Sequence, residues 1–125
     1  MLSDKDAIAM IAVKDVNAAA KFYEGTLGLS RLDSEGEEVI TYCSGSAKFN
    51  VYRSQYAGTN KATSVMWNVG DELDSIVATL KSKGVTFERY DMPGLTLQGD
   101  VYSAGNMKVA WFKDLDGNIL SIVSG

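Results

Sequence analysis

The residue types that carry most enzyme and metal chemistry are scarce in this chain. It has 125 residues, no histidine and a single cysteine, Cys43. Histidine is the commonest general base near neutral pH and the commonest transition-metal ligand, so its absence excludes Ser-His-Asp and Cys-His catalysis and every mixed histidine–carboxylate metal site. One cysteine allows no intrachain disulfide and no thiolate cluster. Nothing near Cys43 in sequence would activate its thiol, so it is interpreted as a small buried residue.

The side chains that remain for proton transfer are tyrosines, one lysine and several carboxylates. No two of them occur at a spacing that would place them as a facing acid–base pair. Asp114 and Asp116 belong to a tight turn, where aspartates typically bond their own backbone. We therefore assign no catalytic residue. The candidates that stay open are Glu37, Glu38, Glu88, Asp91, Asp100 and Lys113.

Composition narrows the partners as well. With 46% hydrophobic and 22% charged residues, the chain is typical of a soluble globular domain. Its net charge of −4 disfavours nucleic-acid binding and is compatible either with a cationic ligand or simply with solubility. The apolar run 7–13 is too short to span a membrane and has the wrong flanks for a secretion signal, so we expect no membrane partner and a cytoplasmic location.

The elements that must position any site follow one order twice. A buried strand, a helix and three short strands are predicted within about 5–54, a polar linker follows over about 55–62, and the order restarts within about 63–125. Within these modules, Asp15 and Asp71 are expected to cap the two helices and Gly28 and Gly84 to end them. The predicted strands are 7–13, 30–34, 38–44, 47–53, 63–69, 85–90 and two within 109–123.

The two halves of the sequence can be aligned with each other. Val13, Asp15 and Gly28 recur 56 positions later as Val69, Asp71 and Gly84. A repeated order of strand, helix and three strands favours two packed modules. We therefore predict a single α+β domain of two βαβββ modules. The alternative, a four-stranded ferredoxin-like sandwich, leaves several strand signals unexplained.

Two motifs carry a family likeness. Residues 13–29 resemble the first-helix signature of the vicinal oxygen chelate superfamily, which includes glyoxalases, extradiol dioxygenases and bleomycin-resistance proteins. Residues 112–118 (FKDLDGN) look like its F-x-D-P-D-G-N turn, with Leu115 in place of the usual proline. The resemblance implies that the paired modules form a curved mixed sheet around a cavity, usually in a homodimer. It implies little about chemistry, since one fold carries unrelated activities.

The metalloenzymes of that superfamily hold their metal on the first and last strand of each module. Carried over onto this chain, those positions are Ile8, Asn50, Ser64 and Ser121, and none is histidine or glutamate. Transition metals need imidazole, carboxylate or thiolate donors. We therefore expect no metal and no other cofactor.

If those positions face the cavity, strand parity brings aromatic, methionine and small polar side chains to the same surface. This composition is typical of a small-molecule pocket, although core packing explains Trp111 and the methionines equally well. Tyr102, in a stretch of 16 extra residues between 91 and 108, would either cap a ligand or belong to a plain excursion hairpin. The predicted ligand-binding residues are Trp111, Tyr52, Asn50, Ser64, Met66, Asn68, Ser121, Met10 and Tyr102.

These observations favour metal-independent binding, and possible sequestration, of a small and partly aromatic molecule, similar to bleomycin-resistance-type proteins. The first alternative is a metal-independent isomerase or lyase, which needs a carboxylate such as Glu88 or Asp91 inside the cavity. The second is a module that binds another protein through its sheet edges. The sequence leaves the ligand unnamed and does not say whether the modules pair within one chain or between two.

Overall fold

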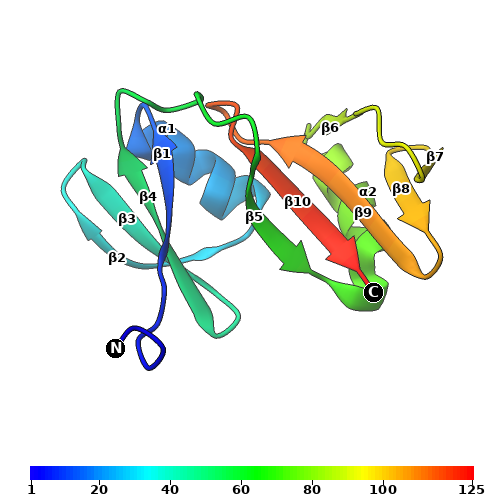
Figure 1. The fold of residues 1–125 in the computed structure, drawn as a ribbon. Helices are drawn as coiled ribbons and strands as arrows, with labels where there is room; N and C mark the ends of the chain where they lie inside the picture. The colour runs from blue at the N-terminus through cyan, green and yellow to red at the C-terminus, as the bar shows by residue number, and fades with distance from the viewer. The chain divides into compact units, whose positions relative to one another are not determined.

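The computed structural model describes every residue from 1 to 125 and consists of two compact units, Met1–Thr59 and Asn60–Gly125. The division falls inside the polar stretch expected to act as a linker. Each unit carries a helix on one face of its own mixed sheet and leaves the other face without a helix (Figure 1). The predicted α+β class with two βαβββ modules is confirmed, as two separate sheets that do not close.

The first unit contains a four-stranded sheet in the order β1-β4-β3-β2. Strand β1 runs parallel to β4, and the other neighbours are antiparallel. A parallel pair needs a long crossover connection, which the helix and the two intervening strands provide. The elements are β1 (Ala9–Val13), α1 (Val16–Ala20), the π-helical segment η1 (Lys21–Thr26), β2 (Ser30–Glu35), β3 (Val39–Ser44) and β4 (Ala47–Arg53).

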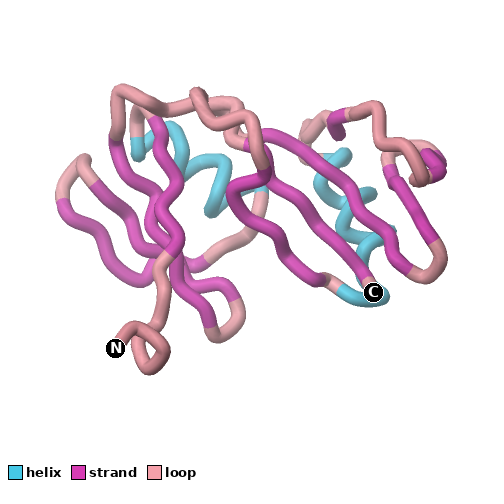
Figure 2. The backbone as a smooth tube through the Cα atoms, viewed as in Figure 1, coloured by secondary structure: helices cyan, strands magenta, loops and turns pink.

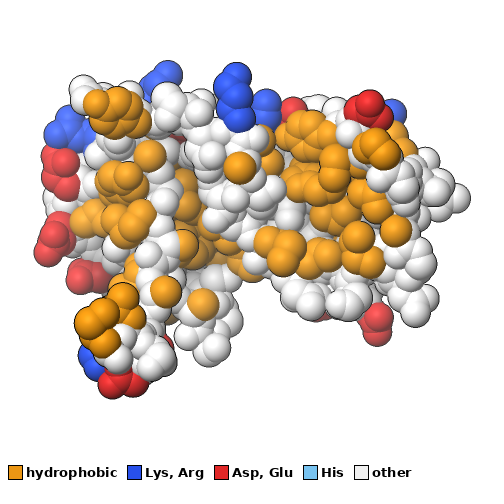
Figure 3. Space-filling view, in the orientation of Figure 1, with side chains coloured by type: hydrophobic (Ala, Val, Ile, Leu, Met, Phe, Trp, Pro, Cys, Tyr) orange, Lys and Arg blue, Asp and Glu red, His pale blue; other side chains and the backbone are white.

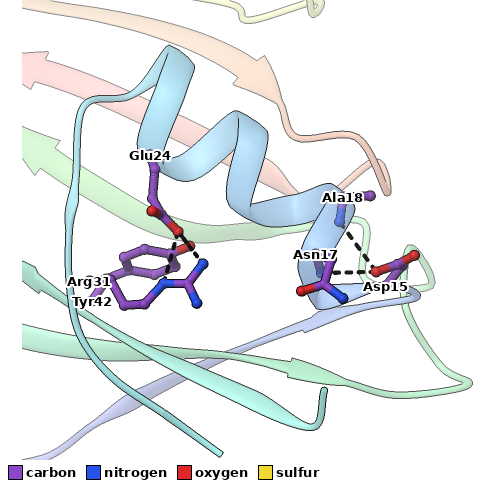
Figure 4. A network of polar contacts seen from close by, with 6 residues as sticks. All are labelled: Asp15, Asn17, Ala18, Glu24, Arg31 and Tyr42. Carbon is purple, nitrogen blue, oxygen red and sulfur yellow. Dashed lines mark hydrogen bonds and ion pairs between the residues drawn. The ribbon is translucent and has the colours of Figure 1, made fainter. Parts of the chain in front are cut away.

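The first helix begins as the sequence predicts. Asp15 has extended backbone, and its Oδ1 accepts hydrogen bonds from the backbone N–H groups of Asn17 at 2.8 Å and Ala18 at 3.2 Å (Figure 4). These bonds satisfy two donors that have no partner within the helix. After Ala20 the helix widens, and the Leu27 N–H bonds the carbonyl of Phe22, five residues back, at 2.9 Å.

A polar network ties this π-helical segment to the sheet. The hydroxyl of Tyr42 donates to Glu24 Oε2 at 2.8 Å, and Arg31 Nη2 donates to the same oxygen at 2.6 Å (Figure 4). The hydrogen bond from Arg31, aided by the one from Tyr42, lowers the pKa of Glu24. Burial, with the Glu24 carboxylate, raises the pKa of Tyr42, whose ring is fully buried between Tyr23 and Phe49.

The second unit contains a six-stranded sheet in the order β5-β10-β9-β8-β7, with β6 also paired to β9 (Figure 2). The short strands β6 and β8 therefore share one edge of β9, since β6 pairs with its last residues and β8 with its first. The elements are β5 (Thr63–Asn68), the 3-10 turn η2 (Gly70–Glu72), α2 (Leu73–Ser82), β6 (Phe87–Glu88), β7 (Thr96–Gln98), β8 (Val101–Ala104), β9 (Met107–Lys113) and β10 (Ile119–Ser124).

The expected cap of the second helix is wrong. Asp71 lies inside η2, and Glu72, the residue before α2, makes no side-chain capping bond. Gly70 has a φ of 55°, and its N–H donates to Asn68 Oδ1 at 3.2 Å, so a 3-10 turn that begins at Gly70 precedes the helix, and its cap position is Val69, two residues before Asp71. Positive φ at Gly70 makes this entry possible without strain.

The strand expected over 85–90 is shorter than predicted. Only Phe87 and Glu88 pair with β9. The N–H of Val85 is still bonded to the helix, through the carbonyl of Leu80 at 3.0 Å, and the N–H of Tyr90 donates to the Tyr102 hydroxyl oxygen at 2.6 Å. The backbone N–H groups of Val85 and Tyr90 are therefore bonded outside the sheet and do not extend the strand.

The 16 extra residues form the excursion hairpin β7–β8, which extends the sheet. Its turn is fastened to the helix side of the unit, because Asp100 pairs with Lys81 Nζ at 2.7 Å and Arg89 Nη2 at 3.5 Å. The hydrogen bond from Lys81 is the main cause of the lowered pKa of Asp100.

The core of this unit lies between its sheet and α2. Phe112 is 1% exposed and meets the ring of Phe87 at 5.7 Å, which confirms that its side chain faces the helix. Leu73, Leu120 and Ile122 are buried on the same side. Neither this helix nor any other in the structure has the length and apolar character needed to cross a membrane.

Candidate functional site

The open face of the second sheet is apolar. In the strand register, Ser121 of β10 lies between Met66 of β5 and Trp111 of β9, so the three side chains share one face. Hydrophobic side chains gather over β5, β10 and β9 on this face (Figure 3). Met66 is 61% exposed, whereas Ser121 between its two larger neighbours is only 2% exposed.

Trp111 is the centre of an aromatic cluster on that face. Its ring meets the ring of Tyr90 at 5.6 Å and the ring of Tyr102 at 5.4 Å, both edge to face. Such pairs contribute about 0.5–1.5 kcal/mol each beyond their area burial. The Tyr102 hydroxyl donates to the Tyr90 carbonyl at 2.8 Å and accepts from the Tyr90 N–H at 2.6 Å. These two bonds fix the backbone that carries the Tyr90 ring.

A pocket of about 230 Å³ opens beside this cluster. Every residue that lines it belongs to the second unit, and most of the lining is apolar or aromatic. The polar side-chain groups are one amine, two hydroxyls and the indole N–H of Trp111, and no carboxylate is among them. The lining residues are Lys61, Ala62, Thr63, Tyr90, Met92, Trp111 and Ile119.

The hydroxyl of Tyr90 has no hydrogen-bond partner, although its oxygen is buried. Leaving a buried hydroxyl unpaired costs about 1–3 kcal/mol. Burial, followed by the charge of Glu88, raises the pKa of Tyr90, so the phenol stays protonated at neutral pH and presents a donor. This is the kind of group that an external acceptor would satisfy.

The nearest carboxylate on this face is already paired. Glu88 lies opposite Trp111 in the register, and its Oε1 is 3.4 Å from Lys113 Nζ. Asp91 is exposed and, like Glu88, lies outside the pocket lining. Neither Glu88 nor Asp91, the two carboxylates considered as a general base from the sequence, therefore lies in the pocket lining.

The open face of the first sheet is polar in the corresponding place. Asn50 of β4 lies between Met10 and Thr41 in the register. The Thr41 hydroxyl donates to Asn50 Oδ1 at 2.7 Å, and Asn50 Nδ2 donates to Met10 Sδ at 3.4 Å. Tyr52 continues the same face beside Ala12. The expected sharing of one face by Met10, Asn50 and Tyr52 is confirmed within this unit.

The sequence-predicted residues of the second unit take different positions. Trp111 lines the pocket, and Met66 and Ser121 lie beside it on the next strands. Tyr102, in strand β8 of the excursion hairpin, is 3% exposed and its ring packs against Trp111. Ser64 sits at a bulge and accepts from Asn60 Nδ2 at 3.2 Å, and Asn68 is used at the start of η2.

The sequence reasoning missed Tyr90, Thr63, Met92, Lys61 and Ala62 as pocket residues. A signal for the first was present, because Phe87 and Glu88 alternate between the helix side and the open side. Continuing that alternation places Tyr90 on the open side with Glu88. Lys61, Ala62 and Met92 lie in irregular segments, where parity gives no direction, and Thr63 precedes the irregularity in β5 that breaks its pairing register with β10.

The residues at the metal-ligand positions of the resembled family do not fit a transition metal. Ile8 has no donor atom, Asn50 is bonded to Thr41, and Ser64 and Ser121 offer only hydroxyls. The structure contains no group of three or more cysteine, aspartate or glutamate side chains placed to hold a metal ion.

Comparisons with known proteins agree with this fold. A profile of the Glyoxalase/Bleomycin resistance protein/Dioxygenase superfamily matches residues 7–122. An integron cassette protein from the mobile metagenome of Halifax Harbour Sewage Outfall superposes with a TM-score of 0.71 at 16% identity, covering 97% of this chain and 99% of that one. No curated protein matches the sequence.

Two further solved structures are similar. The fosfomycin resistance protein FosX from Listeria monocytogenes gives a TM-score of 0.73 at 13% identity, with 98% of this chain and 93% of that chain covered. Lactoylglutathione lyase from Agrobacterium tumefaciens gives 0.70 at 13% identity, with 97% and 94% covered. At these identities the likeness concerns the fold alone.

Proposed function

This chain belongs to the Glyoxalase/Bleomycin resistance protein/Dioxygenase superfamily, and on that premise we propose that it binds a small, partly aromatic molecule without a metal ion. The pocket beside Trp111 is the binding site in this proposal. Binding serves to sequester the molecule, as the bleomycin-resistance part of the family description suggests. We further propose that the protein acts as a cytoplasmic homodimer, as the family resemblance implies.

The observation that carries the proposal is the composition of the pocket. Ligand sites combine mostly apolar and aromatic walls with a few polar groups that fix orientation. Trp111, Ile119 and Met92 supply the walls, and Tyr90 and Thr63 supply hydroxyls. A volume of about 230 Å³ lies just below the 300–1,000 Å³ usual for drug-sized ligands. We therefore expect a molecule of one or two rings.

Tryptophan fluorescence tests this proposal directly, because the chain has only two tryptophans. In a Trp67→Phe variant all tryptophan emission comes from Trp111 at the pocket. In a Trp111→Phe variant it comes from Trp67, whose neighbour in the register is Ile122 on the helix side. We expect one- and two-ring aromatic compounds to change the emission of the first variant in a saturable way and to leave the second unchanged.

Thermal unfolding supplies an independent readout. A ligand present at a hundred times its Kd stabilises the native state by about 2.7 kcal/mol. The stabilisation should be present in wild type and in Trp67→Phe and reduced in Trp111→Phe. A compound set that produces neither a fluorescence change nor a shift in Tm in any variant would contradict the proposal.

The alternative, a metal-independent isomerase or lyase, finds one supporting group. The protonated phenol of Tyr90 at the pocket is able to act as a general acid. Its base is missing from the pocket lining, because Glu88 is paired with Lys113. Turnover of a ligand found by fluorescence, lost in Tyr90→Phe, would favour this alternative over sequestration.

A further inference from the structure

The charge at the pocket points to the class of ligand. Lys61 is the one charged residue in the lining. It is exposed and has no ion-pair partner, whereas Lys81 and Lys108 of the same unit pair with Asp100 and Asp74. An unpaired amine at the edge of an apolar pocket favours an anionic group on the molecule that enters it.

The hydroxyls of the lining fit the same chemistry. Tyr90 presents a protonated and unpartnered phenol. Thr63, two residues after the lysine, adds an exposed hydroxyl to the same pocket lining. A carboxylate oxygen accepts hydrogen bonds from such donors, and hydrogen bonds to a charged acceptor contribute about 1.5–3 kcal/mol, roughly twice the value for neutral pairs.

We propose that the pocket binds an aromatic carboxylate, with the ring against Trp111 and Tyr90 and the carboxylate toward Lys61. This inference rests on the proposed function and adds the charge of the ligand to it. Two electrostatic features act against the binding of an anion. Glu88 lies on the same face but is neutralised by Lys113 at 3.4 Å. The net charge of −4 repels anions at long range, but salt screens charges beyond about 8 Å at physiological ionic strength.

The test compares three probes that share one ring system: 2-naphthoate, 2-naphthamide and 2-naphthylmethylammonium. Their binding is measured by the emission of Trp111 in the Trp67→Phe background. We expect the carboxylate to bind at least tenfold more tightly than the cation, with the amide between them. The preference for the carboxylate should shrink as the salt concentration rises, because Lys61 is exposed.

Lys61→Gln removes the charge, and Lys21→Gln removes another exposed charge, on η1 in the other unit, as a matched control. Lys61→Gln should weaken naphthoate about two- to fivefold, since exposed ion pairs contribute little, and should leave the amide unchanged. Lys21→Gln should change neither. Because both substitutions are on the surface, loss of folding does not confuse the comparison.

Tyr90→Phe separates a ligand role from a structural one. Because the hydroxyl has no partner in the free protein, its removal should raise Tm while weakening naphthoate about tenfold. A lower Tm in Tyr90→Phe, or equal affinity for the three probes in the presence of a Trp111 signal, would overturn the carboxylate assignment and leave the proposed function standing. Absence of a Trp111 signal with all three probes would overturn both.

Discussion

The open faces of the two sheets share a plan and differ in the residues at two matching positions. In each unit a residue of the last strand lies between a methionine of the first strand and a third residue: Asn50 between Met10 and Thr41, and Ser121 between Met66 and Trp111. In the first unit the amide bonds both of its neighbours. In the second unit the third residue is an indole that brings two tyrosine rings with it.

The difference teaches what makes a sheet face a binding surface. A face whose polar groups satisfy one another gains little from a ligand, because each new hydrogen bond replaces an existing one. The second unit keeps a half-buried indole and an unpaired phenol beside a pocket. It therefore carries both the apolar area and the unsatisfied donor that an external molecule would complete.

The largest expected effect on stability comes from comparing Trp111 in the second unit with Thr41 in the first. Trp111→Ala should destabilise the protein by about 3 kcal/mol, because it removes a large ring and its two aromatic contacts. Thr41→Ala at the matching position should cost about 1 kcal/mol, the value of one hydrogen bond. Urea denaturation of the two variants measures both. Equal losses would show that the indole packs no better than the threonine.

The central positions provide the second comparison. Ser121 is 2% exposed, so Ser121→Asn introduces an amide into a filled site and should cost about 2 kcal/mol. The reverse exchange, Asn50→Ser, should cost about 1 kcal/mol, since that site opens to water and loses mainly the bond from Thr41. Unfolding free energies from the same denaturant series decide it, and a cheaper Ser121→Asn would contradict the packing of the second face.

The support of the aromatic cluster gives a third prediction. Tyr102→Phe keeps the ring against Trp111 but removes the hydroxyl that bonds the backbone of Tyr90. We expect a loss of about 1.5 kcal/mol and weaker ligand binding, because the Tyr90 N–H and carbonyl lose their partner. Tyr52→Phe on the open face of the first unit is the control and should be close to neutral in both measurements.

The smallest effect concerns acid pH and belongs to the first unit. The pKa of Glu24 is lower in the native state than its ordinary value of 4.5, so the unfolded chain binds more protons and stability falls as pH drops below about 4.5. Glu24→Gln should flatten this decline by less than about 1 kcal/mol, because the pair with Arg31 is well exposed. Unfolding free energies between pH 6 and pH 3 test it, with Glu72→Gln as the control.

Much of the fold could be predicted because its signals are local. Alternating strands, the Asp15 cap and the glycine ends of the helices each depend on a few neighbouring residues. The cap at Asp71 failed because Gly70 and Asn68 offered a competing turn, in which an amide replaces the carboxylate. Residues of a similar local type thus led to the right cap in one unit and the wrong one in the other.

The candidate site could be predicted only in part. Parity along regular strands correctly placed Trp111 on the open face and Phe112 beneath the helix. Tyr90 could not be placed in the same way, since its backbone is held by a side chain 12 residues further along the chain. Such a contact depends on the tertiary fold and leaves no periodic signal. For Tyr102, the sequence left a ligand cap and a plain hairpin open, and the structure places the residue in the hairpin strand β8.

The divided edge of β9 makes one part of this chain a natural place for change. Because β6 and β8 each pair with only part of that edge, the segment 89–95 between β6 and β7 carries no ladder hydrogen bonds of its own. It also contributes Tyr90 and Met92 to the pocket. Residues can be inserted or exchanged there without breaking a strand pair. The shape of the pocket can therefore be re-engineered by loop replacement, on a scaffold whose sheet and helix stay as they are.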